Sequence, residues 1–332
     1  MLLKGFLTRY GGISLALAGI LAGLGCHRAD VQQSLAKQVR STPGSAPKVL
    51  AVYEPWFGDP DHINVGYSSR DRVTVQRQIE QAQSQGISGF VVDWYGTHKP
   101  TLDSAYNLMQ QTAAEVGFKV ALMYDEPSDD SDATTAAISA MDYAYQHYIS
   151  RYAPARAAYL TYQDRPVVFV WPRNHNTDWN LIRQHVNGWE QPPLLIMEDG
   201  TNDTRNFDGF YAWVRPGAGG WTSDGRNWGR DYLEGFYRRM TTKYPDKIAV
   251  GAAWPGFDDR KASWSENRFM DARCGRTFEE SLSLFRRYYT NDNPLPFLLV
   301  ETWNDYEEGT AIERGINTCR SSPKDTKVGG AD

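Results

Sequence analysis

Eight short apolar runs, separated by longer amphipathic segments, constrain the fold of this chain more than any other feature of its sequence. The runs span residues 48–53, 87–95, 118–124, 165–171, 193–197, 207–213, 247–254 and 296–303. Short strand-like runs that alternate with helix-like segments are typical of βα units, which build parallel sheets. The sequence therefore predicts a parallel sheet of eight strands.

Six of the connections between these runs have the composition and end signals of helices. The expected helices lie within residues 71–86, 102–117, 132–153, 178–186, 231–244 and 277–290. The first two end at Gly86 and Gly117, and glycine is the usual residue just past a helix C-terminus. The connection after residue 197 is short and polar, and we predict no helix there.

Eight such units predict an α/β fold of the (β/α)8 TIM barrel type, with the barrel spanning residues 48–318. A doubly wound open sheet is the alternative, but no glycine-rich phosphate loop follows the first run. Few residues follow the eighth run, so the last βα unit is expected to be short or irregular. The tail, residues 319–332, is expected to be disordered.

The first 26 residues have the pattern of an export signal. Lys4 and Arg9 supply a basic start, and the apolar run that follows is shorter than the roughly 20 residues of a membrane span. The segment ends at Cys26, and it resembles a bacterial lipoprotein signal in which this cysteine is lipidated. An ordinary cleaved signal peptide is the alternative.

Either signal implies an exported protein. A lipidated Cys26 would anchor it in the bacterial cell envelope through the lipid alone, whereas a cleaved signal would give a periplasmic or secreted protein. Residues 27–47 are polar, with Pro and Gly near their end, and predict a flexible tether.

Composition narrows the classes of partner and cofactor. The chain has 35 Lys and Arg against 40 Asp and Glu, a net charge of −5, which gives no basic footprint for nucleic acid. If Cys26 carries lipid, Cys274 and Cys319 are left as a pair, and an oxidising compartment permits a disulfide between them. No Cys-x-x-Cys occurs, and no His lies two to five residues from another His or a Cys. We therefore predict no metal site and no cofactor.

The ends of the predicted strands collect aromatic and acidic side chains, and active sites of TIM barrels lie at those ends. The tryptophans are Trp56, Trp94, Trp171, Trp213, Trp254 and Trp303, and the acids are Glu54, Asp93, Asp125, Glu126, Glu198 and Asp199. Any one of them could instead plug the barrel top or cap a helix. Together they suit glycosidic chemistry, in which sugar rings are held and an acid and a base are supplied.

The stretch TWNDYEEGTAIE, residues 302–313, resembles the strand-eight signature of the related glycoside hydrolase families 71 and 99. Family 99, of endo-α-mannanases and endo-α-mannosidases, typically reads N-E-W-H-E-G-T-x-I-E, matched here by Asn304, Glu308, Gly309, Thr310, Ile312 and Glu313. The α-1,3-glucanases of family 71 carry T-W-N-D-[WY]-G-E-S, matched by Thr302, Trp303, Asn304, Asp305, Tyr306 and Glu308. Residues 81–96 are similar to the strand-two segment of both families. The likeness extends loosely over residues 49–316.

The resemblance implies a catalytic carboxylate pair, with Asp305 as the base and Glu308 as the acid. In family 99 the first carboxylate is thought to act on the sugar 2-OH with net retention, whereas the family 71 pair resembles an inverting couple. Asp305 is one methylene shorter than the glutamate of family 99. This leaves room for a water and favours inversion, for which carboxyl separations of ~6.5–9.5 Å are usual. The same departure puts an α-mannan substrate in doubt.

The other acidic and aromatic groups complete the predicted site. The substrate-binding candidates are Glu54, Trp56, Asp93, Trp94, Glu126, Trp254, Asp258, Trp303 and Asn304. We expect the charge of Asp305 and the apolar cover of Trp303 or Tyr306 to raise the pKa of Glu308. Glu307 is expected to be solvated, and Glu301 either binds substrate or neutralises an arginine.

The sequence thus predicts an exported glycoside hydrolase that cleaves an α-linked oligo- or polysaccharide. The alternative is a non-catalytic carbohydrate-binding barrel whose acid/base pair has drifted. A secreted structural barrel is a third possibility.

Overall fold

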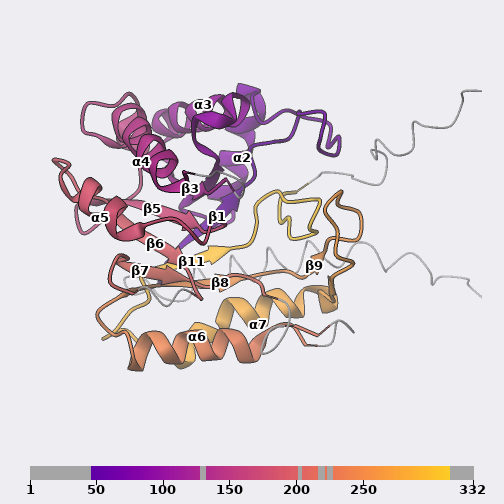
Figure 1. Ribbon diagram of the computed structural model, residues 1–332. Coiled ribbons are helices and arrows are strands. Elements are labelled where there is room, and N and C mark those ends of the chain that lie inside the picture. The colour runs from indigo at the N-terminus through magenta and orange to yellow at the C-terminus, as the bar shows by residue number, and fades with distance from the viewer. Residues whose placement is uncertain (1–45, 128–131, 201–203, 216–220, 223–226, 315–332) are drawn as a thin grey trace, which may run out of the picture.

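The computed structural model describes residues 46–127, 132–200, 204–215, 221–222 and 227–314, and a closed barrel of eight parallel strands forms its centre (Figure 1). In order around the barrel the strands are β1 (Lys48–Tyr53), β2 (Gly89–Trp94), β3 (Lys119–Asp125), β5 (Arg165–Trp171), β6 (Leu194–Glu198), β7 (Gly209–Tyr211), β8 (Ile248–Ala253) and β11 (Phe297–Val300). The ring closes because β3 pairs with β5 and β11 pairs with β1. The predicted TIM barrel is confirmed.

Helices surround the barrel, with α2, α3 and α4 on one side and α6 and α7 on the opposite side (Figure 1). The helices are α2 (Arg72–Ser84), α3 (Pro100–Val116), α4 (Ala133–Ala144), α5 (Trp179–Asn187), α6 (Arg230–Thr242) and α7 (Arg276–Leu284). All six predicted helices are confirmed, and α4 continues into a turn of π-helix at Tyr145–Ile149. Gly86 and Gly117 follow α2 and α3 with φ of 83° and 70°, the left-handed conformation that glycine adopts without strain.

Short elements extend the ends of the barrel. Strand β4 (Thr161–Tyr162) pairs antiparallel with β5, and β9 (Phe257–Asp258) pairs with β10 (Phe269–Met270) in a hairpin after β8. The 3-10 turns are Gly96–His98, Arg156–Ala158, Arg273–Gly275 and Phe285–Arg287. In the described part of the last unit, residues 301–314 form turns and no helix, as expected for an irregular unit.

Two apolar layers hold the barrel, because successive side chains on a strand point to opposite faces. One layer fills the barrel interior and includes Leu50, Val52, Val91, Ala121, Met123, Val167, Phe169, Ile196, Val250 and Leu299. The other packs the strands against the helices and includes Ala51, Tyr53, Phe90, Val92, Leu122, Tyr124, Val168, Met197, Phe210 and Val300. The next inward position on β1 is therefore Glu54, on β2 Asp93 and on β3 Asp125.

Several predictions concern residues that the structure does not describe. The export signal with Cys26, nearly all of the tether and the tail lie outside the described residues. In the described residues, no helix is both long and apolar enough to cross a membrane. Cys274 is exposed and free there, and its expected partner Cys319 lies outside the described residues, so their disulfide stays a prediction.

Candidate active site

A ring of buried carboxylates lines the C-terminal mouth of the barrel. Glu54, Asp93, Asp125 and Glu301 are each at most 5% exposed. Burial raises the pKa of Glu54 well above its usual range, and the nearby charges of Asp93, Asp305 and Glu308 raise it further. Burial has the same effect on the pKa of Asp93. The inward series of each strand thus continues into an acidic cluster.

Two arginines that the sequence did not suggest neutralise part of this cluster. The Arg173 guanidinium binds both carboxylate oxygens of Asp125, one of them at 2.5 Å. Arg215 donates to Glu198 at 2.9 Å. No such cation binds Glu54 or Asp93, and one oxygen of each carboxylate has no hydrogen-bond partner among the described residues. The mouth therefore holds more carboxyl groups than cations that pair with them, and the raised pKa values favour the neutral form of the unpaired ones.

Glu301 extends the cluster toward β7. It is fully buried, and one of its oxygens accepts the backbone N–H of Val214 at 2.6 Å. The other oxygen has no hydrogen-bond partner in the part of the chain that is described, so the expected arginine does not bind it there. Burial raises the pKa of Glu301 well above its usual range.

The tight turn after β11 fixes Asp305. One oxygen of its carboxylate accepts the backbone N–H groups of Glu307 at 2.9 Å and Glu308 at 2.8 Å, and its own N–H donates to Thr302 Oγ1 at 2.7 Å. Burial raises the pKa of Asp305 well above its usual range, and the charge of Glu308 adds to this effect. The two N–H donors act in the opposite direction, because they stabilise the ionised form.

Glu308 belongs to the same turn and is more open to solvent than Asp305. Its Oε1 accepts the indole N–H of Trp264 at 3.2 Å, and its backbone carbonyl accepts the N–H of Asp258 at 2.8 Å. Burial raises the pKa of Glu308, whereas the hydrogen bond from Trp264 lowers it. The indole beside this carboxylate therefore belongs to Trp264, and the sequence had suggested Trp303.

Glu307 is not solvated, so that expectation is wrong. Its side chain is 3% exposed, accepts a hydrogen bond from the backbone N–H of Ile63 at 3.2 Å, and lies 2.7 Å from Nδ1 of His62. The His62 ring stacks on Trp56 with a centroid distance of 4.9 Å. Glu307 thus joins the turn after β11 to the loop after β1.

Asn304 is fully buried and joins the same two segments. Its side-chain oxygen accepts the N–H of Glu54 at 2.7 Å, and its amide nitrogen donates to the carbonyl of Glu54 at 2.8 Å. These bonds occupy the amide of Asn304, and its expected contact with a sugar stays a prediction. The side chain fixes the backbone that carries the Glu54 carboxylate.

Three of the tryptophans expected at the mouth lie elsewhere. Trp94, Trp254 and Trp303 are 0% exposed and pack in the layer between strands and helices. Trp94 follows Phe90 and Val92 in the outward series of β2 and donates to Asp103 at 3.0 Å. None of the three rings offers a face on which a sugar could stack, so we correct their expected substrate-binding role.

The remaining candidates lie around the mouth in different settings. Trp56 is 9% exposed beneath His62. Glu126 accepts hydrogen bonds from Thr177 and from two backbone N–H groups of the loop after β5, so it organises that loop. Asp258 forms a bidentate ion pair with Arg260 at 2.7 and 2.8 Å.

The aromatic surface near the mouth comes from residues that the sequence did not identify as substrate-binding candidates. Trp171 and Trp213 are partly exposed and meet edge to face at 4.9 Å. Trp264, in the loop between β9 and β10, is 40% exposed. No periodic pattern surrounds Trp264, and its contacts with Glu308 and with the His62 ring relate it to the site.

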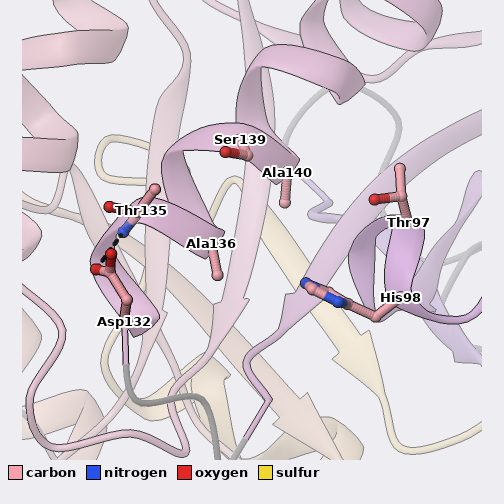
Figure 2. Close-up of a pocket in the computed structure, with 7 residues that line it drawn as sticks. All are labelled: Thr97, His98, Asp132, Thr135, Ala136, Ser139 and Ala140. Atoms are coloured by element: carbon pink, nitrogen blue, oxygen red, sulfur yellow. Dashed lines mark hydrogen bonds between the residues drawn. The ribbon is translucent and has the colours of Figure 1, made fainter.

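A separate pocket of about 300 Å³ lies between the 3-10 turn after β2 and the start of α4 (Figure 2). It is lined by Thr97, His98, Asp132, Thr135, Ala136, Ser139 and Ala140. None of these residues belongs to the predicted site. In the described residues, no group of three or more His, Cys, Asp or Glu side chains is arranged to hold a metal ion.

Comparison with known proteins adds a likeness in fold. No protein-family model matches the chain, and no curated protein sequence matches it either. A solved structure of the family 99 endo-α-mannosidase of Bacteroides thetaiotaomicron, in complex with bis-tris propane, has a TM-score of 0.62 and 17% identity, over 80% of this chain and 86% of that one. A second structure of that enzyme has a TM-score of 0.62 and 16% identity, over 80% and 87%.

A glycoside hydrolase-like protein is also similar, with a TM-score of 0.56 and 15% identity, over 84% of this chain and 91% of that one. At these identities the likeness is one of fold. The chain is therefore a TIM barrel with an acidic mouth, similar in fold to the family 99 endo-α-mannosidase.

Proposed function

We propose that the protein is a glycoside hydrolase that cleaves an α-linked glycan, with Asp305 as the base and Glu308 as the acid. The observation that carries this proposal is the turn after β11. It holds two carboxylates three residues apart at the mouth of the barrel, Asp305 buried and Glu308 partly exposed, and both have raised pKa values. Hydrolysis of a glycosidic bond needs such a pair, with one group protonated and the other ionised.

Glu308 suits the acid role because burial keeps its proton at a pH where an exposed glutamate has lost it. It is also the more open of the two groups, so a glycosidic oxygen can approach it. Asp305 suits the base role because two backbone N–H groups stabilise its carboxylate. Burial raises the pKa of Asp305 as well, so the base role requires that the proton shared by the two carboxyl groups reside on Glu308.

The same bonds favour an inverting reaction. One oxygen of Asp305 is occupied by the two N–H groups, which leaves the other to receive a proton from a water. That water would attack the anomeric carbon while Glu308 donates its proton to the leaving oxygen, and the configuration would invert. Glu54, Asp93 and Glu301 would accept hydrogen bonds from the sugar hydroxyls.

Two independent likenesses support an α-linked substrate. The strand-eight motif resembles families that act on α-glucan and α-mannan, and the similar solved structure is named an endo-α-mannosidase. Export, with a lipid anchor at Cys26, is part of the proposal because residues 1–26 have the pattern of a lipoprotein signal.

The test is release of reducing sugar from a panel of α-glucans and α-mannans. We expect hydrolysis by the wild type, and a loss of about 10²–10⁴-fold in Asp305→Asn and Glu308→Gln, the usual contribution of acid–base catalysis. Glu80→Gln, an exposed glutamate on α2, is the matched control and should keep full activity. Binding of oligosaccharide without any hydrolysis would instead identify a non-catalytic carbohydrate-binding barrel.

A further inference from the structure

The loop between β9 and β10, residues 259–268, is built around one buried carboxylate. Asp259 is 0% exposed and accepts the backbone N–H of Arg268 at 2.7 Å and that of Glu266 at 3.3 Å. The Arg268 guanidinium adds a hydrogen bond at 2.6 Å. Because a buried carboxylate with several donors fixes the backbone around it, the tip of this loop has a defined position.

The loop is also docked on the turn that carries Asp305 and Glu308. The N–H of Asp258 donates to the carbonyl of Glu308 at 2.8 Å. The next residue, Gly309, has φ of +68°, and a Cβ placed there would lie 3.2 Å from Cβ of Asp258. Glycine therefore allows both the turn and the close approach of the two segments.

Trp264 is presented at the tip of this docked loop. Its indole N–H donates to Glu308 Oε1. Its ring packs edge to face against the His62 ring, with the centroids 6.0 Å apart and the ring planes at 69°. His62 in turn is stacked on Trp56 and paired with Glu307. The indole is thus supported by the loop after β1, and 40% of its surface remains exposed beside the carboxylate.

We propose that Trp264 forms the floor of a subsite that binds the sugar on the leaving-group side of the scissile bond. This inference rests on the proposed function, because it takes Glu308 as the acid. A general acid lies within about 2.6–3.2 Å of the oxygen that it protonates. Since Trp264 shares a hydrogen bond with Glu308, its exposed ring lies beside that glycosidic oxygen, where the apolar C–H face of a sugar can pack on it.

The position of Trp264 distinguishes the two sides of the bond. Asp305, Glu54 and Asp93 are buried in the mouth and would receive the sugar whose anomeric carbon is attacked. Trp264 is 40% exposed, and of the two proposed catalytic carboxylates it is Glu308 to which it donates a hydrogen bond. The sugar over its ring is therefore the one that departs.

The surroundings of Trp264 also indicate the class of sugar. The two aspartates of its loop are paired, Asp258 with Arg260 and Asp259 with Arg268. The third cation of the loop, Lys261, is exposed, and its charge helps to lower the pKa of Asp258. What the subsite offers a sugar is the exposed face of the Trp264 ring, which fits the apolar C–H face of a pyranose.

The test compares substrates with and without a leaving-group sugar. We expect Trp264→Ala to lower kcat/KM at least about tenfold on α-linked gluco- and manno-disaccharides, since a well-packed aromatic contact contributes on that scale. On the matching α-glycosyl fluorides, which have no second sugar, the change should stay within about twofold. Tyr152→Ala, which removes an aromatic ring that is 75% exposed on another part of the surface, is the matched control.

A second variant separates stacking from the hydrogen bond. Trp264→Phe keeps a ring for the sugar but removes the N–H donor to Glu308. The other charged groups that face Glu308 stay in place in this variant, namely Asp305, Asp259, Arg268 and Arg173. We expect its KM for disaccharides to return toward that of the wild type. The basic limb of its pH profile should move to higher pH, because the acid loses a bond that favours its ionised form.

Equal losses of Trp264→Ala on disaccharides and fluorides would overturn the subsite, and so would the absence of any loss. If the wild type hydrolyses nothing, the proposed function fails, and saturation-transfer NMR with the same disaccharides tests the subsite on its own. The wild type should then transfer saturation to the reducing-end ring, and Trp264→Ala should not. Equal transfer in both proteins, or none in either, would contradict the inference.

Discussion

The imidazole of His62 lies 2.7 Å from a carboxylate oxygen of Glu307, and this pair joins the loop after β1 to the turn after β11. The two residues are 245 positions apart in the chain. Figure 1 shows the loop after β1 and the loop around β9 on the same side of the molecule. The pair therefore joins the loop after β1 to the turn that carries Glu308, and the loop between β9 and β10 contacts the same turn through Trp264 and Asp258.

Replacing His62 should weaken the fold at this point. His62→Ala leaves the buried Glu307 carboxylate with the Ile63 N–H as its remaining donor, and an unsatisfied buried group costs about 1–3 kcal/mol. Urea unfolding of His62→Ala, Glu307→Gln and the double variant measures the coupling between the two side chains. If the losses of unfolding free energy in the two single variants add up to the loss in the double variant, the interaction between His62 and Glu307 contributes nothing to stability.

Gly309 offers a test with a built-in control. Gly309→Ala forces an alanine into the left-handed conformation and also places its Cβ too close to Asp258. Gly66→Ala forces the same conformation at φ of +83°, but its Cβ contacts nothing within 4 Å. We expect both variants to lose about 1–2 kcal/mol in unfolding free energy. Only Gly309→Ala should also lose activity, because the loop with Trp264 must shift. Equal activities of the two variants would show that the close approach at Gly309 is not needed.

Asn304 should act through Glu54. Asn304→Ala removes two hydrogen bonds to the backbone of Glu54 and leaves a buried N–H and a buried C=O without these partners, at a cost of about 1–3 kcal/mol each at most. Sugar binding, measured by calorimetry, should weaken together with stability. Weaker binding at unchanged stability would instead favour direct contact between the Asn304 amide and the sugar.

The raised pKa of Glu54 predicts a pH-dependent stability. Because folding raises this pKa, the neutral form is favoured in the folded state, and the wild type loses stability as pH rises above the usual carboxyl range. Glu54→Gln lacks this penalty. Its Tm should exceed that of the wild type at pH 8 by roughly 2–4 °C for each kcal/mol gained, and the difference should shrink toward pH 4. If the difference in Tm between Glu54→Gln and the wild type stayed constant from about pH 4 to pH 8, ionisation of Glu54 would be excluded as its cause.

The barrel could be predicted because its signal is local and repeated. Each strand is an apolar run bounded by turn residues, and each helix has its own end signals, as at Gly86 and Gly117. The acids at the mouth follow from the same local rule, since Glu54 and Asp93 continue the inward series of their strands. That rule also places Trp94 outward with Phe90, so its burial was within reach of the sequence.

The rest of the site depends on contacts between distant segments. The chain leaves the regular strand after Val300, so strand alternation no longer tells where Trp303 and Asn304 point. Trp264 meets Glu308 across 44 positions, from a loop without periodicity. The burial of Glu307 depends on His62 and Ile63, which the sequence gives no reason to bring there. Tertiary packing decides each of these cases.

The most direct test of the central claim compares an α-glycosyl fluoride with an α-linked disaccharide of the same sugar in the two carboxylate variants. Fluoride leaves without help from an acid, so Glu308→Gln should keep most of its activity on the fluoride and lose about 10²–10⁴-fold on the disaccharide. Asp305→Asn should lose activity on both substrates, because both need the base. If Asp305→Asn hydrolysed either substrate as fast as the wild type does, the result would contradict the proposed role of Asp305 as the base.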